Sequence, residues 1–281
     1  MENTSVGPGS DLRDAIKRVF EKRIEQSFLS KIDECIGADG DFVDLVYQSS
    51  INYLTRRVIR TALYIETKAK SAGRSEDQII TETRAMIRSL LNSEPYPSYK
   101  EYDLEVEKIL FLARDCVIAI ARDLSSGLKN QVRRSAQSKA RQPKCYICGT
   151  PLDFTTSGNA NSAEVEHIWP QSLGGAAAEH NLAIACRECN QRKQSYLDHA
   201  DFHYEHFVIS KDEGDSGFAE EFKREYKIAL WARNNYCCSM CDAPASQMGR
   251  LSFLKRDESD TWHMLNVDVY CDRCEKRLRR A

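Results

Sequence analysis

Two Cys-x-x-Cys pairs lie within one stretch of this sequence, at Cys145/Cys148 and at Cys186/Cys189. Four thiolates with this spacing are typical of a tetrahedral zinc site, and a site closed by four sulfurs leaves no coordination position for water or substrate. We therefore predict a structural zinc ion here, so any reaction must depend on other residues of the stretch. The candidates are Glu166, His167, Asn181 and Asn190.

The order of residues in this stretch resembles that of the HNH endonucleases. After the first cysteine pair come Glu-His-Ile-x-Pro-x-Ser-x-Gly-Gly from Glu166, Asn-Leu at Asn181, and Cys-x-x-Cys-Asn-x-x-Lys from Cys186. The resemblance implies a treble-clef-like finger with a two-stranded hairpin and a helix around one catalytic metal ion. It also implies that His167 is the general base that deprotonates water and that Asn181 orients its imidazole, while Glu166 and Asn190 hold the divalent ion.

The chemistry of these side chains agrees with that implication. Phosphodiester hydrolysis needs a nucleophilic water, a base active near neutral pH, and a cation beside the developing charge. Histidine has the unperturbed pKa that suits the base, and one carboxylate with one amide suits Mg²⁺ or Mn²⁺, which complete their shells with water and phosphate. Consecutive strand residues point to opposite faces, so Glu166 and His167 converge only if the backbone leaves the pleat, which Pro170 and Gly174-Gly175 favour.

A second cysteine unit follows near the end of the sequence and predicts a second structural zinc ion. Its four thiols are those of Cys238, Cys241, Cys271 and Cys274.

This second unit has the spacing of an internal repeat. Asn266 precedes Cys271 by the same interval as Asn181 precedes Cys186. Two unrelated zinc knuckles are the alternative. The unit contains no Glu-His pair, because His263 stands alone and Glu275 takes the position of Asn190. We expect it to be non-catalytic and to serve in packing, dimer contact or DNA backbone contact through Lys276, Arg277, Arg279 and Arg280.

Composition places the chain among globular proteins with a core and small satellite modules. It has 281 residues, 42% hydrophobic and 29% charged, and lacks both a membrane-length apolar run and a signal peptide, so we expect a cytoplasmic protein. Eight of its eleven cysteines fall in Cys-x-x-Cys pairs, which suits thiolate ligands in a reducing compartment. A formal charge of −2 gives no global attraction to nucleic acid, so DNA binding must depend on local basic surface.

The sequence predicts a mainly α protein with small α+β zinc modules. Residues 10–127 have the apolar spacing of four amphipathic helices, two of which open with capping boxes at Ser75/Gln78 and Ser98/Glu101. We expect this helical domain to act in partner docking, sensing or self-association. The remaining segments are a disordered tail at 1–9, a basic linker at 128–144, the nuclease domain at 145–210, and a C-terminal helix with the second finger at 216–281.

The basic linker contains no acidic residue between Lys129 and Lys144. It is either a solubilising connector or a surface that contacts DNA phosphates, and its position beside the first finger favours DNA. The predicted DNA contacts are Arg133, Arg134, Lys139, Arg141, Lys144, Arg192 and Lys193. After them, His199, His203 and His206 favour an aromatic-rich packing segment over a second metal site, because a continuing helix would place His199 about 13 Å from Asn190.

These observations predict a metal-dependent endonuclease that hydrolyses DNA, with a context in restriction or phage defence implied by the resemblance. Two alternatives remain at this point. One is a non-catalytic zinc-finger protein that binds nucleic acid, and the other is a nuclease directed at RNA.

Overall fold

The computed structural model describes residues 6–24, 40–92, 103–202, 208–209 and 224–280. The chain divides into two compact units, one formed by Met1–Leu124 with His167–Asn181 and the other by Ser125–Glu166 with Leu182–Ala281. The described residues are rich in helix, with small two-stranded sheets and two cysteine clusters. None of their helices combines the length and the apolar composition that a bilayer crossing requires.

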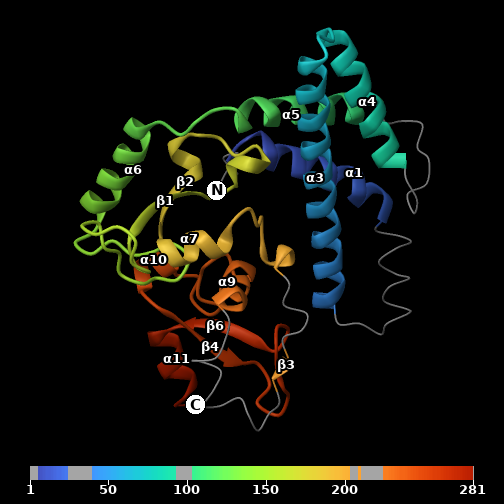
Figure 1. The fold of residues 1–281 in the computed structure, drawn as a ribbon. Helices are drawn as coiled ribbons and strands as arrows, with labels where there is room; N and C mark the ends of the chain where they lie inside the picture. The colour runs from blue at the N-terminus through green and yellow to red at the C-terminus, as the bar shows by residue number, and fades with distance from the viewer. Residues whose placement is uncertain (1–5, 25–39, 93–102, 203–207, 210–223, 281) are drawn as a thin grey trace. The chain divides into compact units, whose positions relative to one another are not determined.

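The first unit is built on four helices: α1 (Pro8–Ile24), α3 (Gly40–Ser71), α4 (Glu76–Asn92) and α5 (Asp103–Ile120). Helix α3 is the longest of the four, and α1, α4 and α5 each contact it, with α5 running across it (Figure 1). The apolar positions that share one face of each helix form the core because helical periodicity brings them together. Its fully buried members include Leu12, Ile16, Ile51, Ile59, Ile87 and Ile109.

The helix boundaries differ in part from the prediction. The capping box at Ser75 is confirmed, because Ser75 N donates to Gln78 Oε1 at 3.0 Å and Gln78 N donates to Ser75 Oγ at 3.4 Å. The first helix begins at Pro8, inside the predicted disordered tail; proline suits the first turn of a helix because it lacks only an N–H that would be unbonded there. The box at Ser98/Glu101 lies outside the described residues.

The segment His167–Asn181 belongs to the helical unit and carries two short 3₁₀ turns, η1 (Gln171–Leu173) and η2 (Glu179–Asn181). It is held against α1 and α5: Gly9 N donates to Gly174 O at 3.1 Å, and η1 contacts α5. Gly174 has φ +79°, and a Cβ on it would lie 2.6 Å from Cys116 Sγ. Glycine is therefore required at this position both for the backbone and for the close approach of α5.

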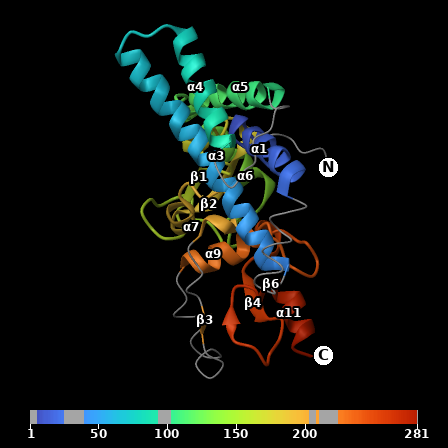
Figure 2. The ribbon, with the colours of Figure 1, turned by 90° about the vertical axis from the view of Figure 1, so that its right-hand side faces the viewer.

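The second unit contains the two cysteine fingers and the helices packed on them. Its helices are α6 (Ser126–Lys139), α7 (Arg187–Lys193), α9 (Arg224–Arg233), α10 (Ala245–Met248) and α11 (Asp272–Leu278). Its strands pair two by two: β1 (Ala163–His167) with β2 (Leu182–Cys186), β3 (Val208–Ile209) with β5 (Trp262–His263), and β4 (Leu251–Lys255) with β6 (Val267–Cys271). Figure 2 shows the β4–β6 hairpin beside α11.

The predicted basic linker is mostly a helix, which corrects that assignment. The fourth bundle helix ends at Ile120, and α6 then begins after Ser125, whose side chain accepts a hydrogen bond from Leu128 N at 3.2 Å. Helix α6 buries Val132 and contacts β2. A run of like charges is readily accommodated on a helix that has one apolar contact face and leaves its other faces in water.

Candidate active site and zinc centres

Each cysteine unit gathers four sulfur atoms at one point. Within each group, the Sγ atoms all lie within 4.8 Å of one another, which fits a tetrahedral zinc ion with Zn–S bonds of about 2.3 Å. The two groups are Cys145, Cys148, Cys186 and Cys189 in the first finger, and Cys238, Cys241, Cys271 and Cys274 in the second.

The knuckles of the two fingers have the same backbone hydrogen bonds. Cys145 N donates to Thr150 O at 2.9 Å, and Cys238 N donates to Ala243 O at 3.0 Å. The residue that closes each knuckle has a left-handed backbone, at Gly149 (φ 71°) and Asp242 (φ 53°). Glycine and aspartate tolerate this conformation better than most residues, so both sequences suit the same turn.

Asn181 is fully buried and holds the loop that follows His167. Its Oδ1 accepts from Trp169 N at 2.7 Å, and its Nδ2 donates to Trp169 O and Ala176 O, both at 3.0 Å. Its backbone oxygen accepts from Ile168 N at 2.8 Å. Both amide hydrogens are thus used by the backbone. The observed role of Asn181 is to fix the chain immediately after His167, and direct orientation of the imidazole stays a prediction.

Asn266 makes the same set of bonds in the second finger. Its Oδ1 accepts from Asp257 N at 2.8 Å, its Nδ2 donates to Asp257 O at 3.0 Å and to Thr261 O at 2.9 Å, and its backbone oxygen accepts from Arg256 N at 2.7 Å. The two fingers thus have the same architecture at the positions that the spacing predicted, and β1, β2 and α7 correspond to β4, β6 and α11.

Comparison of the two fingers separates the residues that both have in common from the polar residues found only in the first. Both fingers have the four cysteines and the asparagine clamp, by which we mean Asn181 or Asn266 with its backbone hydrogen bonds. Five polar positions of the first finger are replaced in the second: Glu164 by Ser252, Glu166 by Leu254, His167 by Lys255, Asn190 by Glu275 and Lys193 by Leu278. Because the second finger folds in the same way without these five groups, they are not required by the fold.

Glu166 lies in the core of the first finger with both carboxylate oxygens bonded. Lys193 Nζ donates to Oε1 at 2.6 Å, and the Tyr146 hydroxyl donates to Oε2 at 2.6 Å. The side chains of Lys193 and Glu166 are only 2% and 5% exposed. This burial corrects the prediction that Lys193 contacts DNA: its ammonium is enclosed in an ion pair inside the protein.

Tyr146, which bonds Glu166, packs against Tyr236. Their rings meet edge to face, with centroids 5.4 Å apart. Burial, followed by the charge of Glu166, raises the pKa of Tyr146 well above its usual value. The phenol therefore stays protonated, and its O–H is the donor in the hydrogen bond to the carboxylate. The sequence analysis missed Tyr146, whose signal was its position inside the first Cys-x-x-Cys pair.

Glu164 and Asn190 form a second polar contact between β1 and α7. Asn190 Nδ2 donates to Glu164 Oε2 at 2.7 Å, and Arg187 Nη1 lies 3.4 Å from Glu164 Oε1. Glu164 was not among the predicted residues, although its position two residues before Glu166 places both carboxylates on one strand face. Residues 190 and 193 likewise share a face of α7, so two acids face an amide and an ammonium.

His167 is the last residue of β1 and is half-buried. The strand continues through it, so the predicted departure from the pleat does not occur between Glu166 and His167; it follows at Ile168, where the Asn181 clamp begins. Within β1, His167 therefore lies on the face opposite to Glu166.

The predicted divalent ion can be compared with this donor set. Glu166 and Asn190 occupy facing elements, and the carboxylate of Glu166 already holds a cationic group in the ammonium of Lys193. Asn190 is bonded to Glu164 and not to Glu166, so an ion held by Glu166 and Asn190 would have to take the place of the Lys193 ammonium on Glu166. The same structure makes Lys193 a direct competitor of the ion.

The other predicted DNA contacts fall into two groups. Arg133 is committed to the protein: its guanidinium donates to Ala163 O at 2.6 Å and lies over the Phe154 ring at 5.3 Å from the centroid. Its predicted phosphate contact is replaced by this structural role at the start of β1. Arg192 pairs with Glu225 at 2.8 Å. The side chains that stay on the surface are Arg134, Lys139 and Arg141, with Lys144 half-buried.

The histidines outside the predicted motif positions contribute no metal cluster in the described residues. His199 lies in the short turn η3 (His199–Asp201), and the helix that would have separated it from Asn190 ends at Lys193. His203 and His206 lie outside the described residues. His263 does not take the place of His167 in the second finger; Lys255 does, and its Nζ donates to Glu258 O at 3.0 Å and Asp260 O at 3.2 Å.

Helix α9 reaches the first zinc centre through Arg224. Arg224 Nη2 donates to Cys189 Sγ at 3.1 Å, and the guanidinium lies 5.1 Å from the centroid of the Trp231 ring. With Zn²⁺ bound, the four thiolates would leave the cluster with a net charge of −2, which a cation bonded to one sulfur would stabilise. No pattern in the sequence indicates this interaction, because it joins residues 35 positions apart.

Comparison with known proteins agrees with the site. A family model described as HNH endonuclease matches residues 145–203. No curated protein and no solved structure matches the chain. The matched range includes the first four cysteines, both members of the Glu166–Lys193 pair, His167, Asn181 and Asn190, and it ends before the second finger. Residues 145–203 are a domain of the HNH endonuclease family.

Proposed function

We propose that this protein is a metal-dependent endonuclease that hydrolyses phosphodiester bonds in DNA, and that its first finger, of treble-clef type, is the catalytic one. One observation supports this most: the two fingers share the cysteine cluster and the bonds of the buried asparagine, yet only the first has Glu164, Glu166, His167, Asn190 and Lys193. The second finger adopts the same fold with Ser252, Leu254, Lys255, Glu275 and Leu278 at these positions, so this polar set is particular to the first finger.

In this proposal His167 accepts the proton of the attacking water, since imidazole titrates near neutral pH. Glu166 and Asn190 would hold a Mg²⁺ or Mn²⁺ ion, which supplies positive charge beside the phosphate. Because His167 and Glu166 lie on opposite faces of β1, the proposal requires the end of β1 to change conformation when the ion and DNA bind. Asn181 fixes the backbone directly after His167 through Ile168 N and Trp169 N. Tyr146 orients the carboxylate of Glu166 from within the core, and Lys193 would have to release that carboxylate when the ion binds.

The exposed basic residues Arg134, Lys139 and Arg141 follow one another along α6 and its C-terminal end and support binding to a nucleic acid. Such residues neutralise phosphates without reading sequence, so they support binding to a continuous backbone. DNA is proposed over RNA on the resemblance to HNH endonucleases. A role in restriction or phage defence is part of the proposal and rests on the resemblance to HNH endonucleases alone.

The decisive experiment is cleavage of plasmid DNA and of a structured RNA with Mg²⁺, with Mn²⁺ and after chelation, with zinc content measured in each sample. We expect DNA cleavage that needs a divalent ion and disappears in His167→Ala while zinc content and DNA binding stay near wild type. His180→Ala is the matched control, because His180 is exposed and outside the motif positions. Cleavage of RNA alone would reassign the substrate. Absence of cleavage in a folded, zinc-loaded wild type, or His167→Ala activity above a tenth of wild type, would contradict the proposal.

A further inference from the structure

Helix α5 carries an apolar stripe that nothing in the described chain covers. Leu104, Phe111 and Ile118 are 84%, 60% and 51% exposed. They recur every seven residues, so they lie on one face of the helix, opposite to the buried residues Ile109, Ala113 and Cys116. Three large apolar side chains in one exposed row are more than scattered surface residues, and such rows mark interaction surfaces.

Two charged residues complete the stripe, and the order of residues along it is complementary to its own reverse. Lys108 lies between Leu104 and Phe111, and Asp115 lies between Phe111 and Ile118. Read from one end the stripe is Leu, Lys, Phe, Asp, Ile, and read from the other it is Ile, Asp, Phe, Lys, Leu. Apolar residues therefore meet apolar residues, and a cation meets an anion, when one copy is turned end to end against another.

The charges of the stripe differ from their neighbours on α5. The two charged residues on its flank are paired with α4: Arg84 binds Glu107 through two bonds, one of 3.0 Å, and Arg114 bonds Glu76. In the described part of the chain, no salt bridge involves Lys108 or Asp115, and both are exposed. The stripe thus presents one cation and one anion whose partners are not supplied from within the described unit.

We propose that the α5 stripe is a homodimer interface, in which two copies of α5 pack antiparallel about a twofold axis at Phe111. With a rise of about 1.5 Å per residue, Lys108 lies about 4.5 Å before Phe111 and Asp115 about 6 Å after it. Rotation about the axis therefore brings Lys108 of one copy beside Asp115 of the other, twice. A twofold interface requires such self-complementarity, because each residue contacts its own counterpart or a matching residue.

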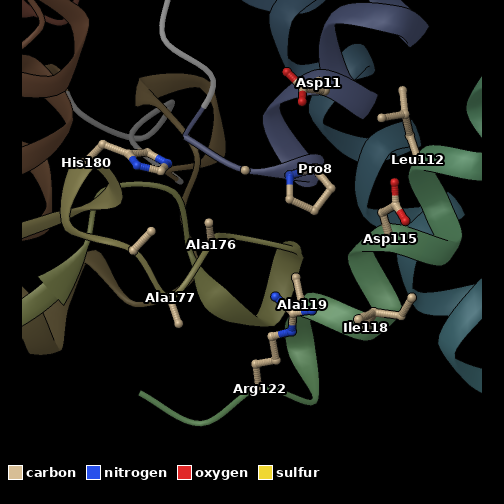
Figure 3. Close-up of a pocket in the computed structure, with 12 residues that line it drawn as sticks. Pro8, Asp11, Leu112, Asp115, Ile118, Ala119, Arg122, Ala176, Ala177 and His180 are labelled. Atoms are coloured by element: carbon tan, nitrogen blue, oxygen red, sulfur yellow. The ribbon is translucent and has the colours of Figure 1, made fainter. Parts of the chain in front are cut away.

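The surroundings of Asp115 favour an incoming lysine. Asp115 and Ile118 line a pocket of about 440 Å³ that is also lined by Asp11 of α1, His180 of η2 and Arg122 (Figure 3). All of these residues belong to the helical unit. The carboxyl groups of Asp11 and Asp115 outnumber the one guanidinium of Arg122, so the ammonium of Lys108 from a second copy would meet net negative charge there.

Dimer formation can be tested by sedimentation velocity of the full chain from below 1 µM to about 100 µM. An interface made by one helix from each copy is smaller than the standard interface of about 1,600 Å², so we expect micromolar dissociation. Phe111→Glu should abolish the dimer, because it places two carboxylates at the axis. Tyr53→Glu is the matched control, since Tyr53 is an exposed aromatic residue of α3 outside the stripe and is 63% exposed.

A charge reversal tests the antiparallel pairing itself. Lys108→Asp alone and Asp115→Lys alone should each raise the dissociation constant about tenfold or more, because both symmetry-related pairs become repulsive. The double variant Lys108→Asp/Asp115→Lys should return to within about threefold of wild type, since reversed pairs re-form. A wild type that stays monomeric throughout, unchanged association in Phe111→Glu, or a double variant no tighter than the singles would overturn the proposal.

Discussion

The buried pair of Lys193 and Glu166 allows a quantitative test of the first finger. Lys193→Met keeps the length and apolar stem of the side chain but removes the ammonium from a carboxylate whose side chain is 5% exposed. Removing one partner of a buried pair costs about 3–5 kcal/mol, because the other charge is left without compensation. At about 2–4 °C per kcal/mol, the melting temperature should fall by roughly 10 °C.

Two further variants separate the ion pair from simple removal of a lysine. Lys193→Met/Glu166→Gln removes both charges and retains an acceptor for the Tyr146 hydroxyl, so most of the stability should return. Lys255→Met is the matched control: the Lys255 side chain is 3% exposed, but its ammonium donates to the Glu258 and Asp260 carbonyl oxygens, so removing it should cost about 1–2 kcal/mol. Differential scanning calorimetry on zinc-loaded protein measures all three. Equal melting of Lys193→Met and Lys255→Met would refute the reasoning.

The same variant also tests whether Glu166 binds the divalent ion. With the ammonium gone, Mn²⁺ should raise the melting temperature of Lys193→Met more than that of wild type, because the ion no longer competes with Lys193. The increase should vanish in Lys193→Met/Glu166→Gln. A Mn²⁺ response that is the same in wild type and both variants would show that Glu166 is a purely structural residue.

The zinc centres and individual interactions elsewhere in the chain give further predictions. Elemental analysis should find about two zinc ions per chain, and Cys186→Ser should lower zinc content and soluble yield together. Gly174→Ala should lower the melting temperature by the equivalent of about 1–3 kcal/mol, since a Cβ meets Cys116 Sγ, and the decrease should be smaller when Cys116→Ala is also present. Burial raises the pKa of Cys116 to about 12, so its alkylation by iodoacetamide at pH 8 should be slow until the protein unfolds. Arg133→Ala should lower stability because it removes the hydrogen bond to Ala163 O, as thermal melting would show. Replacing the exposed cations, in Arg134→Ala, Lys139→Ala and Arg141→Ala, should leave stability unchanged and reduce the salt dependence of DNA binding by roughly 0.9 for each phosphate that is no longer neutralised.

The two fingers could be predicted from the sequence because the spacing of their cysteines and asparagines identifies them. Cysteine spacing determines which thiols can meet around one ion, and the interval from Asn181 to Cys186, repeated from Asn266 to Cys271, fixes where the clamp stands relative to the second knuckle. The capping box at Ser75 is local in the same way, since both of its hydrogen bonds join residues three apart. The cysteine pairs and the capping box have characteristic residue spacings, and the interval from asparagine to cysteine occurs twice, so all three can be found in the sequence.

The roles of individual charged residues could not be predicted in this way. Lys193 and Arg133 stand among other cations in the sequence, yet one is buried against Glu166, 27 positions away, and the other bonds Ala163 O, 30 positions away. Whether a lysine or arginine faces DNA or the core depends on which carboxylate or carbonyl the fold brings beside it, because a buried charge is stable only with a partner. The spacing of cysteines and asparagines determined that two fingers form, and only the tertiary structure decided that Glu166 and Lys193 of the first meet as a buried ion pair, at positions where the second has leucines.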